Sequence, residues 1–115
     1  MGRPVSISTH VLDAVAGRPA AGMTVRLERL DDELVVPLGK GTTDADGRCP
    51  ELTDGLVLES GIHRMRFETG PWFGRTGTTS FYPVVVIAFE VTDPQGRYHV
   101  PLLLSPFAYS TYRGS

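Results

Sequence analysis

The sequence has one cysteine, Cys49, and no asparagine. A single cysteine excludes an internal disulfide framework and a cysteine-rich zinc site, and without asparagine there is no acceptor for N-glycosylation. The longest uninterrupted apolar run, residues 84–89, covers only six positions, whereas a helix needs roughly 20 apolar residues to cross a bilayer. These absences favour a small domain without disulfides and without a membrane partner.

Neither sign of charge dominates the chain. The 11 basic and 13 acidic residues leave a formal net charge of −2, which argues against nucleic acid as the main partner. The first ten residues do not combine a charged start with an apolar stretch of about 7 to 15 residues, as a secretory signal does, so we expect a cytoplasmic protein. The length of 115 residues predicts one domain, spanning residues 1–115.

What the chain does contain is a series of short runs in which apolar and polar residues alternate, separated by glycine and proline. Alternation at period two is typical of half-buried strands. The largely apolar segment 84–91 instead predicts a central strand buried on much of both faces. Residues 17–22 predict a break in the chain, and residues 69–80 a loop with at most one short helical turn. The expected strands cover residues 5–12, 23–30, 33–43, 62–69, 84–91, 97–104 and 107–112, with a short extended piece near 51–53. This spacing predicts an all-β fold, an antiparallel sandwich in preference to a continuous barrel.

Two of the three histidines are expected to point away from the core. His10 lies on the strand face opposite the apolar stripe that begins at Val5, and His99 likewise lies opposite the apolar stripe of its own strand. His63 shares a face with Met65, so we expect it in the core or at its rim. Outward histidines can be merely solvated, or they can divide the roles of base and acid near neutral pH. A metal would need a third ligand, and no His-x-His or His-Glu-x-x-His spacing supports one.

Two further segments carry candidate groups. Residues 44–47 resemble a fragment of a calcium loop but lack the remaining ligands, so a tight turn is the better prediction. Arg48, directly after it, can hold an anionic or carbonyl-rich ligand or be a solvated turn residue. The last four residues offer a phenol, a guanidinium, a hydroxyl and a carboxylate. They are either a frayed tail or groups that the last strand delivers to a site.

Three stretches resemble motifs of the transthyretin family, in the expected order: residues 10–20 (HVLDAVAGRPA), 44–48 (DADGR) and 98–110 (YHVPLLLSPFAYS). Ala108 departs from the family pattern, which usually has glycine or serine there. The ending YRGS is similar to the tail of one branch, the 5-hydroxyisourate hydrolases. The hormone-carrying branch has lysine in place of His10 and lacks both this tail and the counterpart of His99.

The resemblance implies a sandwich of two four-stranded sheets, a short helix near residues 70–78 and a homotetramer built as a dimer of dimers. It also implies ring-opening hydrolysis of 5-hydroxyisourate to 2-oxo-4-hydroxy-4-carboxy-5-ureidoimidazoline, with no metal or organic cofactor. An alternative is a carrier that binds an aromatic small molecule in the channel between dimers. Because the two histidines point away from their own core, we expect a site between subunits. The implied catalytic residues are His10, Arg48, His99 and Ser115, and the implied substrate-binding residues are Arg48, Tyr112, Arg113 and Gly114.

Overall fold

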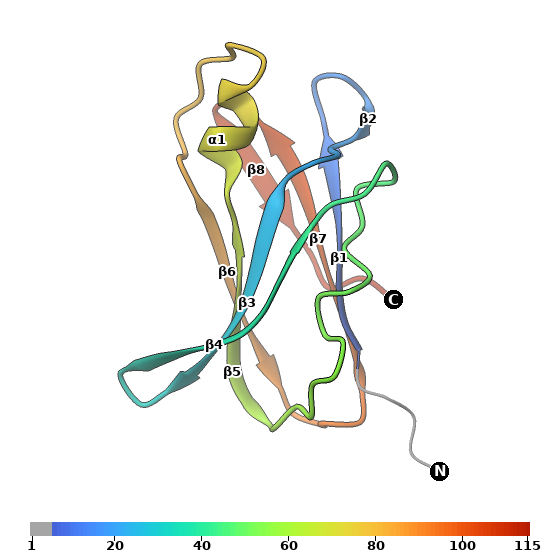
Figure 1. The fold of residues 1–115 in the computed structure, drawn as a ribbon, viewed down its shortest axis with the longest axis vertical. Helices are drawn as coiled ribbons and strands as arrows, with labels where there is room; N and C mark the ends of the chain where they lie inside the picture. The colour runs from blue at the N-terminus through green and yellow to red at the C-terminus, as the bar shows by residue number, and fades with distance from the viewer. Residues whose placement is uncertain (1–5) are drawn as a thin grey trace.

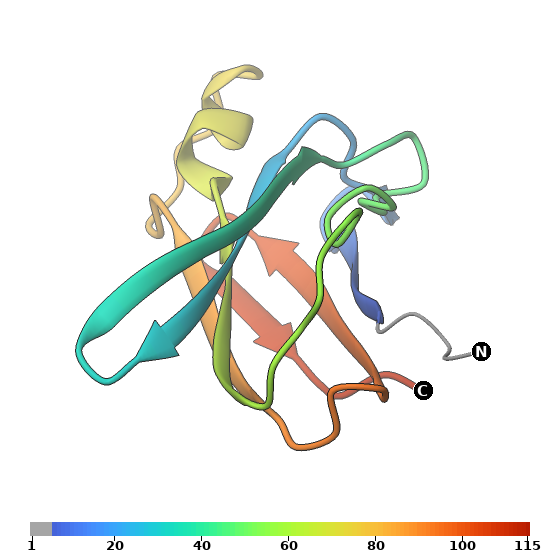
Figure 2. The same ribbon diagram turned by 60° about the horizontal axis from the view of Figure 1, so that its bottom comes forward.

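The computed structural model describes residues 6–115, which form two four-stranded sheets packed face to face (Figure 1). The strand orders are β2-β1-β7-β8 and β4-β3-β5-β6. The predicted sandwich with one short helix is therefore confirmed, and the β3–β4 hairpin extends beyond it (Figure 2). The elements are β1 (Ser6–Asp13), β2 (Arg18–Pro19), β3 (Thr24–Asp31), β4 (Leu34–Thr42), β5 (Gly61–Phe67), α1 (Thr69–Gly74), β6 (Val85–Val91), β7 (Arg97–Ser105) and β8 (Ala108–Thr111).

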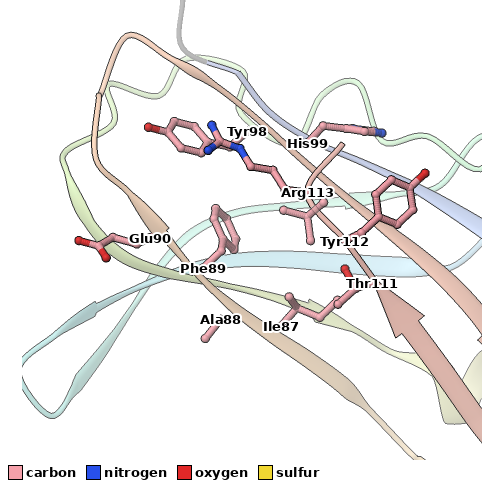
Figure 3. A pocket seen from close by; sticks show the side chains of 10 residues that line it. Ile87, Ala88, Phe89, Glu90, Tyr98, His99, Thr111, Tyr112 and Arg113 are labelled. Atoms are coloured by element: carbon pink, nitrogen blue, oxygen red, sulfur yellow. The ribbon is translucent and has the colours of Figure 1, made fainter. Parts of the chain in front are cut away.

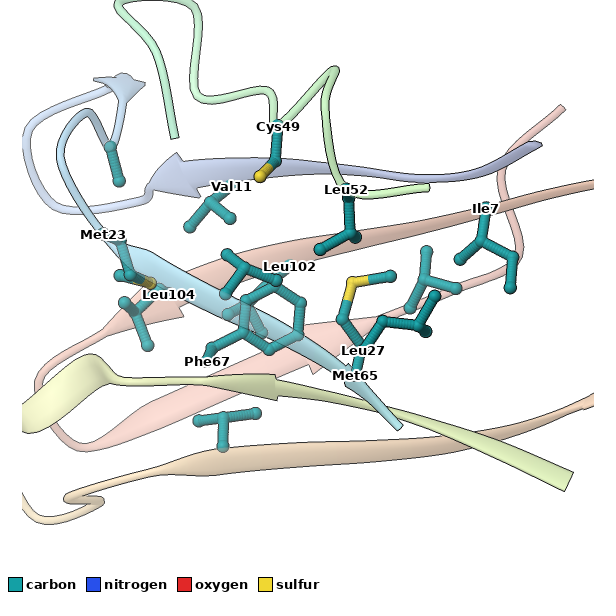
Figure 4. Close-up of a cluster of buried hydrophobic side chains, with 14 of the residues drawn as sticks. Ile7, Val11, Met23, Leu27, Cys49, Leu52, Met65, Phe67, Leu102 and Leu104 are labelled. Atoms are coloured by element: carbon teal, nitrogen blue, oxygen red, sulfur yellow. The ribbon is translucent and has the colours of Figure 1, made fainter. Parts of the chain in front are cut away.

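The core lies between the sheets because alternate side chains of each strand point inward. On β1 the buried residues are Ile7, Thr9 and Val11, which continue the predicted stripe. Val5, its first expected member, lies outside the described residues. The intervening residues of β1 and β7 consequently face away from the second sheet. The largest fully buried side chains come from both sheets and the loops between them (Figure 4): Phe67, Met23, Leu27, Leu52, Met65, Leu102 and Leu104.

The largely apolar segment 84–91 contains the edge strand β6, so the prediction of a central strand is wrong. Among the described residues, β6 pairs only with β5, and its side chains alternate between more and less buried positions. Val86, for example, is 37% exposed. Apolar residues on both faces of a strand do not show that it has a neighbouring strand on each side, because burial of the faces and pairing of the edges are separate properties.

The sequence predicts an antiparallel sandwich, but the sheet that contains β1 is mixed. β1 and β7 run parallel in continuous register, from Ser6 opposite Arg97 to Asp13 opposite Leu104. Parallel neighbours need a long crossover connection, and the whole of the second sheet lies within that connection. Alternation along one strand carries no information about the direction of a partner so distant in the chain.

One local prediction misses a short strand, and another is wrong. The break predicted at residues 17–22 contains the short strand β2, which folds back on the end of β1 because Gly17 adopts a φ of 71°. The extended piece predicted near 51–53 is a series of turns. One of them is closed by a hydrogen bond from the N–H of Leu52 to the carbonyl of Cys49 (3.2 Å).

The helix α1 overlaps the range implied by the resemblance but is shorter. The Trp72 indole fixes it to the sandwich by donating from Nε1 to the carbonyl of Ala21 (2.7 Å). Gly77, with a φ of 68°, follows soon after its end. Within residues 6–115, no helix has both the length and the apolarity to cross a membrane.

Candidate functional site

The candidate site lies on the outer face of the sheet that contains β1 and β7. Their parallel register sets Ser8 opposite His99 and His10 opposite Pro101. Both histidines are half-buried, whereas Val11, the next residue along β1, is fully buried. The predicted outward orientation of His10 and His99 is therefore confirmed.

Residues 44–48 form the predicted tight turn, and the Asp44 side chain closes it. The Asp44 carboxylate accepts hydrogen bonds from the N–H groups of Asp46 (2.9 Å) and Arg48 (3.0 Å). The carbonyl of Arg48 accepts a further bond from the N–H of Asp44 (2.8 Å). The carboxylate is thus engaged with the backbone of its own turn, an arrangement common for aspartate in turns.

This turn docks on β1 and brings Arg48 beside His10. The N–H of Val11 donates to the carbonyl of Gly47 (2.8 Å), and His10 and Arg48 form an isolated antiparallel bridge. Gly47 has a φ of 77°, and a Cβ there would collide with the carbonyl of Val11. Only glycine suits this position, because both the positive φ and the close approach exclude a side chain.

The C-terminal tail returns along β7 and packs on His99. The N–H of Gly114 donates to the carbonyl of His99 (2.9 Å) in a second isolated bridge. A Cβ at Gly114 would overlap Cδ2 of the imidazole and lie 3.0 Å from Cγ, so only glycine permits this contact. Ser115 follows and is exposed. The tail is therefore not frayed at this point. It reaches a candidate histidine, which is the second of the two alternatives that the sequence leaves open.

The surroundings of His99 favour its neutral form. Burial lowers the pKa of His99 below its ordinary value, and the Arg48 guanidinium and His10 lower this pKa further. A backbone hydrogen bond with Ser8 acts in the opposite direction. A neutral imidazole can accept a proton, which a general base near neutral pH requires. The register of β1 and β7 sets His10 and His99 on one face of adjacent strands, and the bridge from His10 brings Arg48 alongside them.

The structure does not bring every expected site residue into this cluster. The Arg113 guanidinium lies over the ring of Tyr98, 5.0 Å from its centroid, and donates to the carbonyl of Arg97 (3.4 Å). In Figure 3, the imidazole of His99 is directed away from this pair. Arg113 and Tyr112 line a hollow of about 300 Å³ between β6 and the β7–β8 pair, and His99 also lines this hollow.

One residue of the cluster was not identified from the sequence. Ser8 lies with its Oγ 2.9 Å from Nδ1 of His99. The available signal was its position two residues before His10, which places both on one face of the strand. In the described part of the chain, no three His, Cys, Asp or Glu side chains lie close enough together to hold a metal ion.

The third histidine and the cysteine lie in the interior. His63 is fully buried, as predicted, and its Nδ1 lies 3.0 Å from the carbonyl of Gly61. Burial, together with the neighbouring Glu51 carboxylate, raises the pKa of Cys49 to about 12. A thiol held in this way is an inert packing group.

Comparison with known proteins gives concordant results. Residues 7–114 match the model of the family described as HIUase/Transthyretin. A 5-hydroxyisourate hydrolase of Mus musculus is 41% identical over 111 residues, which cover 95% of this chain and 94% of that protein. The structure of 5-hydroxyisourate hydrolase from Klebsiella pneumoniae superposes with a TM-score of 0.82 at 38% identity, covering 95% of this chain and 98% of that one.

A sea bream transthyretin in complex with thyroxine has a TM-score of 0.86 at 31% identity, covering 94% of this chain and 93% of that one. A hydrolase and a thyroxine-bound transthyretin therefore have the same fold, so the fold by itself does not distinguish the two functions. The family model covers nearly all of the chain, and a relative above 40% identity covers it almost end to end. The chain belongs to the HIUase/Transthyretin family.

Proposed function

We propose that this protein hydrolyses 5-hydroxyisourate to 2-oxo-4-hydroxy-4-carboxy-5-ureidoimidazoline, a step of urate degradation. The observation that carries the proposal is the grouping of His10, Arg48 and His99 on one outer sheet face, with the tail packed on His99. The reaction adds water to a ring carbonyl and breaks a carbon–nitrogen bond. It therefore needs a proton acceptor, a proton donor and a group that stabilises negative charge on oxygen.

Each of the three side chains can supply one of these needs. Arg48 is suited to a two-pronged hold on the carbonyl edge of a flat, polar ring and to the charge that develops there. One of the two histidines takes a proton from the attacking water, and the other orients the water or protonates the departing ring nitrogen. Positioned acid–base groups contribute about 10²–10⁴-fold to the rate, so removing either histidine is expected to lower the rate by a factor of that order.

The tail contributes by closing the site around His99. Gly114 contacts the imidazole directly, and Ser115 extends beyond it with a hydroxyl and a carboxylate. Arg113 and Tyr112 line the hollow toward β6, which His99 also lines, so their proposed role in substrate binding is exerted from that side. Removing Ser115 is therefore expected to leave the fold intact and to abolish most of the activity.

The site is proposed to form between subunits of a homotetramer. Among the described residues, β6 pairs only with β5 and β8 only with β7, so both strands present an open edge to a second copy. Exposed apolar side chains lie along them, with Val86 37% and Tyr109 40% exposed. Light scattering tests this arrangement, because four copies of the 12.5 kDa chain have a mass of about 50 kDa, whereas a monomer that keeps full activity would contradict it.

The activity is tested by following the absorbance decay of freshly prepared 5-hydroxyisourate with and without the protein. The expected result is a decay much faster than the spontaneous one and proportional to protein concentration. A decay at the spontaneous rate contradicts the proposal. A version lacking Ser115, checked for an unchanged unfolding temperature, tests the tail in the same assay.

The competing function is that of a carrier for an aromatic small molecule, supported by the likeness to the thyroxine-bound sea bream transthyretin. His10, Arg48 and His99 make the proposed site polar, which suits a hydrolytic substrate better than an apolar ligand. Tight thyroxine binding without hydrolysis would favour the carrier. A cytoplasmic location is also proposed, and fractionation of the source cells tests it.

A further inference from the structure

The imidazole of His99 is held along two of its edges. Oγ of Ser8 lies 2.9 Å from Nδ1, and Gly114 packs so closely against Cδ2 and Cγ that no Cβ fits between them. Nδ1 and Cδ2 are the two ring atoms bonded to Cγ, so these contacts flank the base of the ring. The part of the ring left for a substrate is the opposite edge, which carries Nε2.

The hydrogen bond at Nδ1 has a preferred direction. A serine hydroxyl can donate or accept, so its distance alone leaves two tautomers of His99. Burial and the positive Arg48 guanidinium disfavour a positive charge on the ring by lowering the pKa of His99, so only one of its two nitrogens carries a proton at neutral pH. A base that faces the substrate needs its lone pair on the open edge, at Nε2, which leaves the proton on Nδ1 beside Ser8 Oγ.

We propose that Ser8 is a positioning residue that accepts a hydrogen bond from Nδ1–H of His99, so that Nε2 takes the proton of the attacking water. This inference rests on the proposed function and assigns the role of general base to His99. The water oxygen bonds to the ring carbonyl carbon while its proton moves to Nε2. The carbon–nitrogen bond then breaks, and the departing nitrogen takes the proton held on Nε2, which returns His99 to its neutral form. During this step, Ser8 Oγ stays bonded to Nδ1–H of the transient imidazolium, where the bond is charge-assisted.

Three variants separate positioning from a general structural effect. Ser8→Ala removes the hydroxyl, and Ser8→Thr keeps it on the same strand position. Ser60→Ala is the control, because Ser60 is exposed in the loop before β5. Partners that orient a metal-ligating histidine are worth about 10- to 100-fold in activity, and we expect Ser8→Ala to lower kcat by a similar factor with little change in KM. Ser8→Thr restores most of kcat, and Ser60→Ala matches the wild type.

Nitrogen-15 NMR of the histidine ring reads the tautomer directly and needs no substrate. The wild type is expected to carry the proton on Nδ1 of His99 at neutral pH, and Ser8→Ala shifts the population toward the Nε2–H form. A wild-type ring protonated on Nε2 overturns the proposal, as does wild-type kcat in Ser8→Ala or an equal loss in Ser8→Ala and Ser8→Thr. If the wild type does not hydrolyse 5-hydroxyisourate, the proposed function fails, and the tautomer still decides the Ser8–His99 assignment.

Discussion

A single methyl group at Gly114 is the most informative perturbation of the tail. In Gly114→Ala, the new Cβ would overlap Cδ2 of His99 and lie 3.0 Å from its Cγ, whereas carbon atoms in contact are about 3.5–4.0 Å apart. The tail or the imidazole must therefore move by about 1 Å, a displacement that can cost about 10²-fold in rate. The expected result is a loss of kcat/KM of that order.

The same substitution is expected to cost little stability. If the tail detaches, the fold loses the hydrogen bond from Gly114 to the carbonyl of His99, worth about 0.5–1.5 kcal/mol. Thermal unfolding followed by circular dichroism should therefore show a decrease in Tm of only a few degrees, while the absorbance assay shows the large loss of rate. Gly74→Ala is the matched control, because a Cβ at Gly74 meets no atom within 4 Å. Full activity in Gly114→Ala would refute the reasoning that the tail positions His99.

Three further predictions follow from the pKa shifts and the glycine contacts. Because the pKa of Cys49 is about 12, its thiol stays protonated at pH 8, and Ellman's reagent should label it only after unfolding in guanidinium; rapid labelling of the native protein would contradict its burial. Arg48→Ala removes a positive charge that lowers the pKa of His99, so the NMR titration midpoint should rise, whereas Arg48→Lys should leave it nearly unchanged; no rise in Arg48→Ala means that the two side chains do not interact. Gly39→Ala places a Cβ against the carbonyl of Leu52 and should destabilise the fold by about 1–3 kcal/mol in chemical denaturation, and an unchanged midpoint would refute that contact.

The features that the sequence predicted correctly are local ones. Side chains alternate along a strand, so the outward placement of His10 and His99 could be inferred from their immediate neighbours. The turn at residues 44–48 was equally accessible, because aspartate and glycine form turns through contacts within a few residues. In both cases the information lies within one element of the chain.

The features that it did not predict depend on distant pairing. The contact between Ser8 and His99 exists because β1 and β7 are parallel in one particular register, and no pattern within either strand specifies that register. The edge position of β6 depends on the order of all four strands in its sheet, which the residues of β6 do not specify. The position of Arg113 over Tyr98 depends on the path of the tail after β8, which a motif of four residues does not specify.

The central claim is that His10 and His99 act together on one hydrolytic step, and a double-mutant comparison tests it most directly. The measurement is kcat/KM for 5-hydroxyisourate in the wild type, His10→Ala, His99→Ala and the double variant, with Arg26→Ala on the opposite sheet as the control. Groups that act as a unit give strongly non-additive losses. We predict a loss of about 10²–10⁴-fold in each single variant and a double variant no worse than the poorer single one. Near-wild-type kcat/KM in either single variant, or losses that simply multiply, would contradict the claim.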